Sequence, residues 1–187
     1  MKETIQQKIQ IPEADLEKSF EYCDVHHYKK GDFILRIGEY CRFIGYLNSG
    51  LIACTILNDG KEIATDFIHE DCFFTYTEGL SVNLPSHKNF IALEDCEIVW
   101  LGKDKLQPIF SINPKFETLF TQLLAEELRN RLLAEQRART QSLETRYLGF
   151  LESFPDAFNR IPSKHIAGYL GIEPQSLSRL RKRLAGK

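Results

Sequence analysis

The chain has 187 residues, enough for one large domain or two small ones, and 43% of them are apolar, which is ample for a packed core. The sequence has no run of 18 apolar residues and no signal-peptide core, so we expect a cytoplasmic protein with no membrane partner. The net charge of −2 is unevenly spread, because residues 129–187 hold 12 Lys and Arg against 5 Asp and Glu while residues 1–128 hold 12 against 21.

The first 105 residues divide into a short helical segment and a region of short strands. Residues 1–22 predict one or two short helices, with Pro12 to Leu16 as a helix start. After residue 22, short apolar or alternating runs are separated by glycine and Asn/Asp turns. Such spacing indicates an antiparallel sandwich, barrel or jelly roll. The predicted strands are Asp32–Ile37, Phe43–Leu47, Leu51–Leu57, Glu62–Ile68, Phe90–Leu93 and Glu97–Leu101.

A long helix is predicted after Pro114, where apolar side chains recur every three to four residues over about 25 residues. This stripe is wide enough both to cover the strand region and to pair with a second copy of the chain. A core helix that stays within one chain is the alternative. A further helix is predicted over Tyr147–Phe154. The residues expected to form the dimer contact are Leu123, Leu124, Leu128 and Leu132.

Residues 161–187 have the pattern of two helices joined by a sharp turn. The first helix is predicted over Pro162–Leu170, and Gly171 follows it where a helix end often needs left-handed backbone. Pro174 suits the first turn of a second helix, whose buried side would be formed by Leu177, Leu180 and Leu184. This is the layout of a helix-turn-helix, which places one helix in the DNA major groove.

The opposite side of the second helix is rich in hydrogen-bond donors: Gln175, Ser176, Ser178, Arg179, Lys182 and Arg183. Since residues near the start of a recognition helix reach the bases, we expect Gln175, Ser176 and Arg179 to read base edges. We expect Lys182, Arg183 and Lys164 to neutralise phosphates. A solvated basic helix pair, or a pair that binds a protein partner, is the alternative, and only DNA binding would depend strongly on salt.

Nothing in the sequence indicates catalysis or a metal. The five cysteines lack C-x-x-C or Cys/His ligand spacing, so we expect buried free thiols with no metal and no cofactor. His26 and His27 are neighbours, so in a strand they would point to opposite faces and could not share a ligand. Ser/His/Asp, P-loop and H-E-x-x-H patterns are missing, and we expect no enzyme activity.

Several short motifs follow one another in an order found in a known family. In the strand region they are the glycine turns Tyr28–Leu35 and Gly38-Glu39, the segment Tyr46–Ile52, the hairpin Asp59–Glu62 and the segment Ala92–Ile98. At the C-terminal end they are Ile166–Ile172 and Leu177–Arg179. In these motifs, over nearly its whole length, the chain resembles the catabolite-activator/fumarate–nitrate-regulator (Crp/Fnr) superfamily of bacterial transcription factors.

The resemblance implies an α+β fold with an N-terminal antiparallel β-roll like a cyclic-nucleotide-binding domain, a long dimerisation helix and a C-terminal helix-turn-helix. We expect these parts at residues 1–110, 111–140 and 141–187. The resemblance also implies a homodimer on a palindromic operator, with two recognition helices in successive major grooves. The expected partners are double-stranded DNA and a second copy of the chain, with RNA polymerase and an unidentified small effector as further candidates.

The chain departs from the family's cyclic-nucleotide binders in the phosphate cassette. The family's Gly-Glu position holds Phe74-Thr75 and its Arg-Ser position holds Ser86-His87, so the ribose carboxylate and the phosphate-binding arginine are both missing. We therefore expect an effector other than cyclic AMP. The cassette either lines an apolar effector pocket or fills the old one. The candidate pocket residues are Phe73, Phe74, Thr75, Ser86 and His87.

Overall fold

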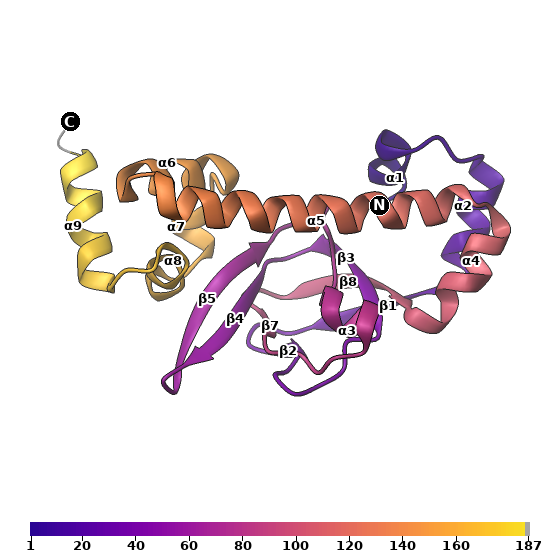
Figure 1. Cartoon of the computed structure of the whole chain (residues 1–187), viewed down its shortest axis with the longest axis horizontal. Helices are drawn as coiled ribbons and strands as arrows, with labels where there is room; N and C mark the ends of the chain where they lie inside the picture. The colour runs from indigo at the N-terminus through magenta and orange to yellow at the C-terminus, as the bar shows by residue number, and fades with distance from the viewer. Residues whose placement is uncertain (186–187) are drawn as a thin grey trace.

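The computed structural model describes residues 1–185, and the last two residues of the predicted segment 141–187 lie outside the described part. Figure 1 shows the strands gathered beside one long helix, with short helices at both of its ends. The strands are β1 (Cys23–Tyr28), β2 (Phe33–Leu35), β3 (Phe43–Ser49), β4 (Ile52–Asn58), β5 (Lys61–Ile68), β6 (Phe73–Phe74), β7 (Asn89–Ala92) and β8 (Cys96–Gly102). The α-helices are α1 (Lys2–Lys8), α2 (Glu13–Phe20), α3 (Thr77–Val82), α4 (Leu106–Ile112), α5 (Lys115–Thr140), α6 (Leu143–Ser153), α7 (Ala157–Arg160), α8 (Ser163–Leu170) and α9 (Pro174–Ala185).

The strands form two four-stranded antiparallel sheets, in the orders β1-β8-β3-β6 and β2-β7-β4-β5. The apolar faces of the two sheets pack on each other around fully buried residues such as Leu47, Ile52 and Ile98. The predicted antiparallel jelly roll is confirmed, and the six predicted strands overlap β2, β3, β4, β5, β7 and β8. Strands β1 and β6 and the helices α3, α4 and α7 were not predicted.

The long helix begins directly after Pro114, as predicted, and α5 then continues for 26 residues, about 39 Å at the usual rise per residue. Its first turns pack against the N-terminal helices through Phe116 and Leu119, which share a buried cluster with Ile5 and Leu16. Beyond this cluster α5 runs alongside the roll toward the C-terminal helices (Figure 1). The helix therefore connects the two ends of the molecule.

The four helices α6 to α9, called the C-terminal helices below, do not form a separate core. Their buried residues, among them Tyr147, Ile166 and Leu177, belong to one cluster with Leu51 and Phe67 of the roll. Helix α8 lies against strand β5, where Gly168 approaches so closely that an added Cβ would stand 3.1 Å from the Ala64 backbone nitrogen. The roll and the C-terminal helices are thus packed as one unit.

Candidate functional site

The turn between α8 and α9 is built by Gly171, whose φ of +69° lies in the left-handed region. Its N–H donates to the Gly168 carbonyl, and the next N–H, from Ile172, donates to the Ala167 carbonyl, both at 2.9 Å. These two bonds close the helix end in a Schellman motif, which a glycine adopts without strain. The chain then restarts as α9 at Pro174, at the position expected from the sequence.

Helix α9 presents two different faces. Leu177 and Leu180 are buried against α8 and α6, whereas Gln175, Arg179 and Lys182 are exposed on the opposite face at helical spacing. Ser176, Ser178 and Arg183 are exposed as well, and so is Lys164 in the first turn of α8. All seven predicted DNA contacts therefore lie on the surface.

Two arginines of α9 have partners inside the chain. Arg183 donates to the Glu144 carboxylate of α6 at 3.3 Å. Arg181, which the sequence analysis did not single out, donates to the Tyr147 hydroxyl at 3.1 Å and to the Ser163 hydroxyl at 3.0 Å. Arg181 therefore joins α9 to both α6 and α8. In the described chain no hydrogen bond or ion pair engages the side chains of Arg179 and Lys182, which are free to meet a ligand.

The predicted effector residues do not surround one pocket. The Phe74 ring lies in the interior of the roll against Phe43 and Phe90, and it fills the space beside Gly45, where a Cβ would come within 2.5 Å of the ring. Thr75 donates to the Phe43 carbonyl at 2.7 Å. Both side chains are thus used for packing within the roll.

The rest of the cassette is held by its own hydrogen bonds. The hydroxyl of buried Ser86 donates to the Lys88 carbonyl at 2.7 Å. His87 is exposed, and its Nδ1 lies 2.7 Å from the hydroxyl of Tyr76, whose ring is only 2% exposed. Phe73 lies elsewhere and lines an apolar cavity of about 80 Å³ beneath the N-terminal helices. This placement favours the alternative in which the cassette side chains fill the former nucleotide pocket over the one in which they line an effector pocket.

The four predicted dimer leucines divide between two environments. Leu123 packs within the chain, at the apolar cavity beneath the N-terminal helices. Leu124 is half-buried, and Leu128 and Leu132 follow it at four-residue spacing with 59% and 58% of their surface exposed. These three leucines form a stripe along α5, called the α5 stripe below.

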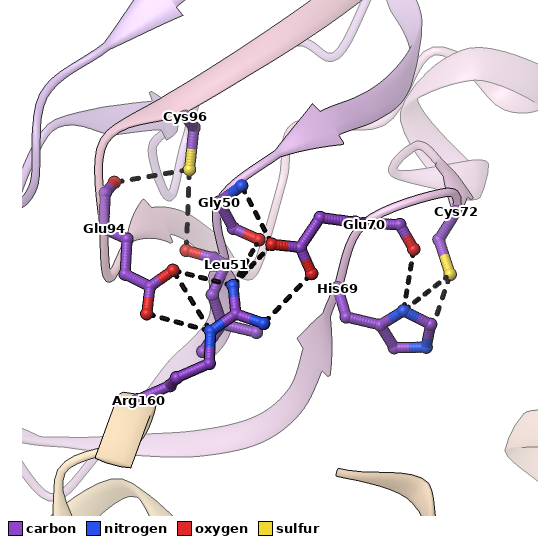
Figure 2. Close-up of polar contacts among 8 residues, drawn as sticks. All are labelled: Gly50, Leu51, His69, Glu70, Cys72, Glu94, Cys96 and Arg160. Atoms are coloured by element: carbon purple, nitrogen blue, oxygen red, sulfur yellow. Dashed lines mark hydrogen bonds and ion pairs between the residues drawn. The ribbon is translucent and has the colours of Figure 1, made fainter. Parts of the chain in front are cut away.

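Arg160, at the end of α7, is the centre of a polar cluster that the sequence did not predict (Figure 2). Its guanidinium donates to the carboxylates of Glu70 and Glu94 and to the Gly50 carbonyl. These partners lie 66 to 110 residues earlier in the chain. No local sequence motif predicts these contacts, because only the fold brings the residues together.

The five cysteines are free thiols; Cys41, Cys54 and Cys96 are buried, as expected, whereas Cys23 and Cys72 are only half-buried. Burial raises the pKa of Cys23 and of Cys72 to about 11, with smaller contributions from nearby carboxylates. A thiol with so high a pKa is protonated near pH 7 and is a poor nucleophile. Within residues 1–185, no group of three or more His, Cys, Asp and Glu side chains is placed to hold a metal ion.

Stability near pH 6 will depend on His165 of α8. Burial lowers the pKa of this imidazole and neighbouring Lys164 lowers it further, against a smaller opposing effect of Glu62. Because this pKa is lower in the folded protein, the unfolded chain binds a proton more readily. The stability that neutral His165 contributes above about pH 6.5 will therefore be lost as the pH falls from there through the lower pKa of the folded protein. Urea unfolding at pH 7.5 and 5.5 will show a larger loss for wild type than for His165→Gln. Equal losses in the two proteins would refute the assignment.

Comparison with known proteins gives a family match for the strand region. Residues 25–113 match the cyclic nucleotide-binding domain family. No curated protein matches the sequence. None of the helices in the described part combines the length and apolarity needed to cross a bilayer.

Solved structures resemble nearly the whole chain. FixK2 from Bradyrhizobium japonicum superposes with a TM-score of 0.75 at 17% identity, over 88% of this chain and 85% of that one. The c-di-GMP-responsive global regulator CLP from Xanthomonas campestris gives 0.71 at 17%, over 94% and 92%. A structure from Eubacterium rectale assigned to the Crp/Fnr transcriptional regulators gives 0.71 at 16%, over 94% and 84%. Residues 25–113 thus match the cyclic nucleotide-binding domain family, and the chain as a whole shares its overall fold with these solved structures.

Proposed function

We propose that this protein is a transcription regulator that binds a specific DNA sequence through α9. The observation that carries the proposal is the exposed face of α9, where Gln175, Arg179 and Lys182 lie side by side on a helix whose other face is buried. Arg and Gln can each make two hydrogen bonds to a base edge, and Lys neutralises phosphate. The basic surplus of residues 129–187 has the sign that DNA requires.

The regulator acts as a homodimer on a palindromic operator. The α5 stripe supports this, because the long helix leaves Leu128 and Leu132 uncovered within the chain. Two copies paired along parallel α5 helices would place their α9 helices at one end of the pair, since α9 lies beyond the C-terminal end of α5 (Figure 1). The two half-sites would then lie about 34 Å apart, one turn of the duplex.

Any small effector of this regulator differs from cyclic AMP. The arginine and the carboxylate that hold a cyclic nucleotide in the family are replaced, and Phe74 and Tyr76 occupy the interior of the roll. A cyclic phosphate without a cationic partner would be costly to bury. RNA polymerase is a further proposed partner, as expected for a regulator of this kind.

The test of DNA binding is selection from a randomised duplex pool with the purified, ligand-free protein at moderate salt. Enrichment of a two-fold symmetric sequence, with affinity that falls steeply as salt rises, is the expected result. Enrichment of no sequence, both with the pure protein and with added extract of the source cells, would reject the proposal. Capture of a protein by the C-terminal helices without any effect of salt would favour the protein-binding alternative.

Arg179→Ala will weaken binding to the selected operator by about 1–3 kcal/mol and relax the preference at one base position. Lys182→Ala is the matched comparison, because it removes a cation from the same face and will weaken binding to all sequences alike. Repeating the selection with each variant measures both effects. Uniform weakening by Arg179→Ala would instead make Arg179 a phosphate contact.

A further inference from the structure

The most concentrated set of polar contacts between the C-terminal helices and the roll converges on one side chain. Arg160 Nη2 donates to Glu70 Oε1 at 2.6 Å, to Glu94 Oε2 at 2.7 Å and to the Gly50 carbonyl at 3.0 Å. Its Nε donates to Glu94 Oε1 at 2.9 Å, and its Nη1 donates to Glu70 Oε2 at 3.0 Å. Every nitrogen of the guanidinium is engaged, in the forked geometry that arginine makes with carboxylates.

The partners of Arg160 come from three connections at one end of the roll. Gly50 lies in the turn between β3 and β4, Glu70 between β5 and β6, and Glu94 between β7 and β8 (Figure 2). The Gly50 turn is fixed independently, because its φ of +102° favours glycine and a Cβ there would stand 2.6 Å from the Asp95 carbonyl. Glu70 also accepts the Gly50 N–H at 3.1 Å. The roll therefore offers a preformed acceptor site.

Two carboxylates held this close need a cation between them. The hydrogen bonds from Arg160 hold the pKa of Glu70 below its usual range, while burial opposes this effect. The carboxylates in turn raise the pKa of Arg160. Without the guanidinium, α7 would lose its ion pairs with the roll. Glu70 and Glu94 would then repel each other across the acceptor site.

The contact lies directly before the helices proposed to read DNA. Helix α7 ends at Arg160, and α8 starts at Ser163. Between them Ile161 is buried in the shared core, after which α8 lies flat on β5. The position of α8 fixes that of α9 through their common core and through Arg181. A side chain that fixes α7 on the roll therefore fixes the orientation of α9.

We propose that Arg160 is a positioning residue for DNA recognition, which fixes the C-terminal helices on the roll in the orientation that a palindromic operator requires. The inference rests on the proposed function of α9. Two features support it: Arg160 and its acceptors lie on the roll side of the C-terminal helices, and the polar face of α9 stays exposed while the contact is made. The contact thus restrains α9 without covering it.

Loss of the Arg160 contact should affect the preference for correctly spaced half-sites more than the affinity for a single half-site. A dimer profits from both half-sites only when its two α9 helices are held at the right separation, because the second contact then forms at a high effective concentration. Releasing the restraint lets each α9 sample other positions. Binding to one half-site stays the same, whereas the advantage of the correctly spaced palindrome shrinks.

The test compares Arg160→Gln with Arg139→Gln, a matched control that removes an arginine from an exposed ion pair with Glu135 on α5. Each full-length protein is titrated with the selected operator, with versions lengthened by one and two base pairs at the centre, and with a single half-site. Amide hydrogen exchange of β5 is measured on the same proteins without DNA. Glu94→Gln, alone and combined with Arg160→Gln, completes the set.

In Arg160→Gln, we expect binding to the correctly spaced operator to weaken by about tenfold, with half-site binding unchanged and less discrimination between spacings. Exchange in β5 will speed up as α8 leaves it. Glu94→Gln will partly reverse this change in Arg160→Gln, because it removes the repulsion with Glu70 that the lost guanidinium leaves behind. Unchanged exchange and unchanged spacing preference would overturn the inference, as would tighter operator binding, since that would make the contact inhibitory. A loss of half-site binding would assign Arg160 a general role in folding.

The exchange measurement separates this inference from the proposed function. If wild type binds no duplex DNA, the function fails, but faster exchange of β5 in Arg160→Gln would still establish the contact as the restraint on α8. If wild type selects a palindrome and Arg160→Gln behaves as Arg139→Gln does, the function stands and the positioning role is wrong.

Discussion

Replacing Leu128 and Leu132 together with glutamate will convert the protein to a monomer and weaken its binding to a palindromic operator by on the order of 100-fold. The two leucines lie one helical turn apart on α5, more than half exposed. In a paired helix they would face their counterparts, and an unpaired carboxylate buried there is strongly unfavourable. Within a single chain the same substitutions cost little, because both side chains already contact solvent.

Sedimentation equilibrium of the free protein and titration with the operator measure the two effects. Leu57→Glu is the matched control, since Leu57 is also 58% exposed but lies on β4 in the hairpin that points away from α5 (Figure 1). This variant will stay dimeric and keep its affinity. A double variant that sediments as wild type does would place the dimer contact elsewhere, and a monomeric wild type with full operator affinity would reject the homodimer.

The parts of the structure that could be predicted from the sequence are those specified by local periodicity. Each of three features can be recognised from a sequence window shorter than two helical turns or from one regular repeat. They are the α5 stripe, the Gly171 turn and the leucines of α9. Helices α8 and α9 begin within a residue of their predicted starts for that reason. The edge strand β1 was missed because it carries Asp24, His26 and His27, and Val25 at its centre is 57% exposed, so no apolar alternation marks it.

The docking of the C-terminal helices on the roll could not be predicted, because it depends on partners far apart in the chain. Nothing near Arg160 in the sequence distinguishes it from the solvated arginines of α5, and its carboxylates become visible only in the fold. The same holds for Leu123, which belongs to the predicted stripe yet packs within the chain against the cluster of the N-terminal helices. Periodicity tells which side of a helix is apolar, but not which neighbour covers it.

Phe67 of β5 is the apolar counterpart of Arg160 in this docking. Its ring, 5% exposed, lies 5.9 Å from Phe150 of α6 and 5.7 Å from Tyr169 of α8 between ring centroids. Phe154, which follows α6, completes the set at 5.8 Å. Aromatic pairs at such separations add to the stability that burial provides. This one strand residue therefore holds the C-terminal helices at several points.

Phe67→Ala will lower the free energy of unfolding by about 3–5 kcal/mol, the usual cost of removing a buried phenylalanine. It will also separate the unfolding transition of the roll from that of the C-terminal helices, two transitions that we expect to coincide in wild type. Trp100, the single tryptophan, lies in the roll stacked on Phe43, so its fluorescence follows the roll, whereas ellipticity follows the helices. In urea the helical signal of the variant will fall first, because the cavity at position 67 weakens the shared core on the side of α6 and α8.

Phe116→Ala is the matched control for this separation. Phe116 is 6% exposed and packs with α1 and α2, in a cluster that, among the described side chains, contains none from the C-terminal helices. Its removal will cost a similar free energy but will leave α8 docked on β5, so hydrogen exchange in β5 will stay at the wild-type rate. Coincident transitions in Phe67→Ala would show that the C-terminal helices do not depend on this contact, and the orientation of α9 would then rest on their other contacts, among them Arg160 and Arg181.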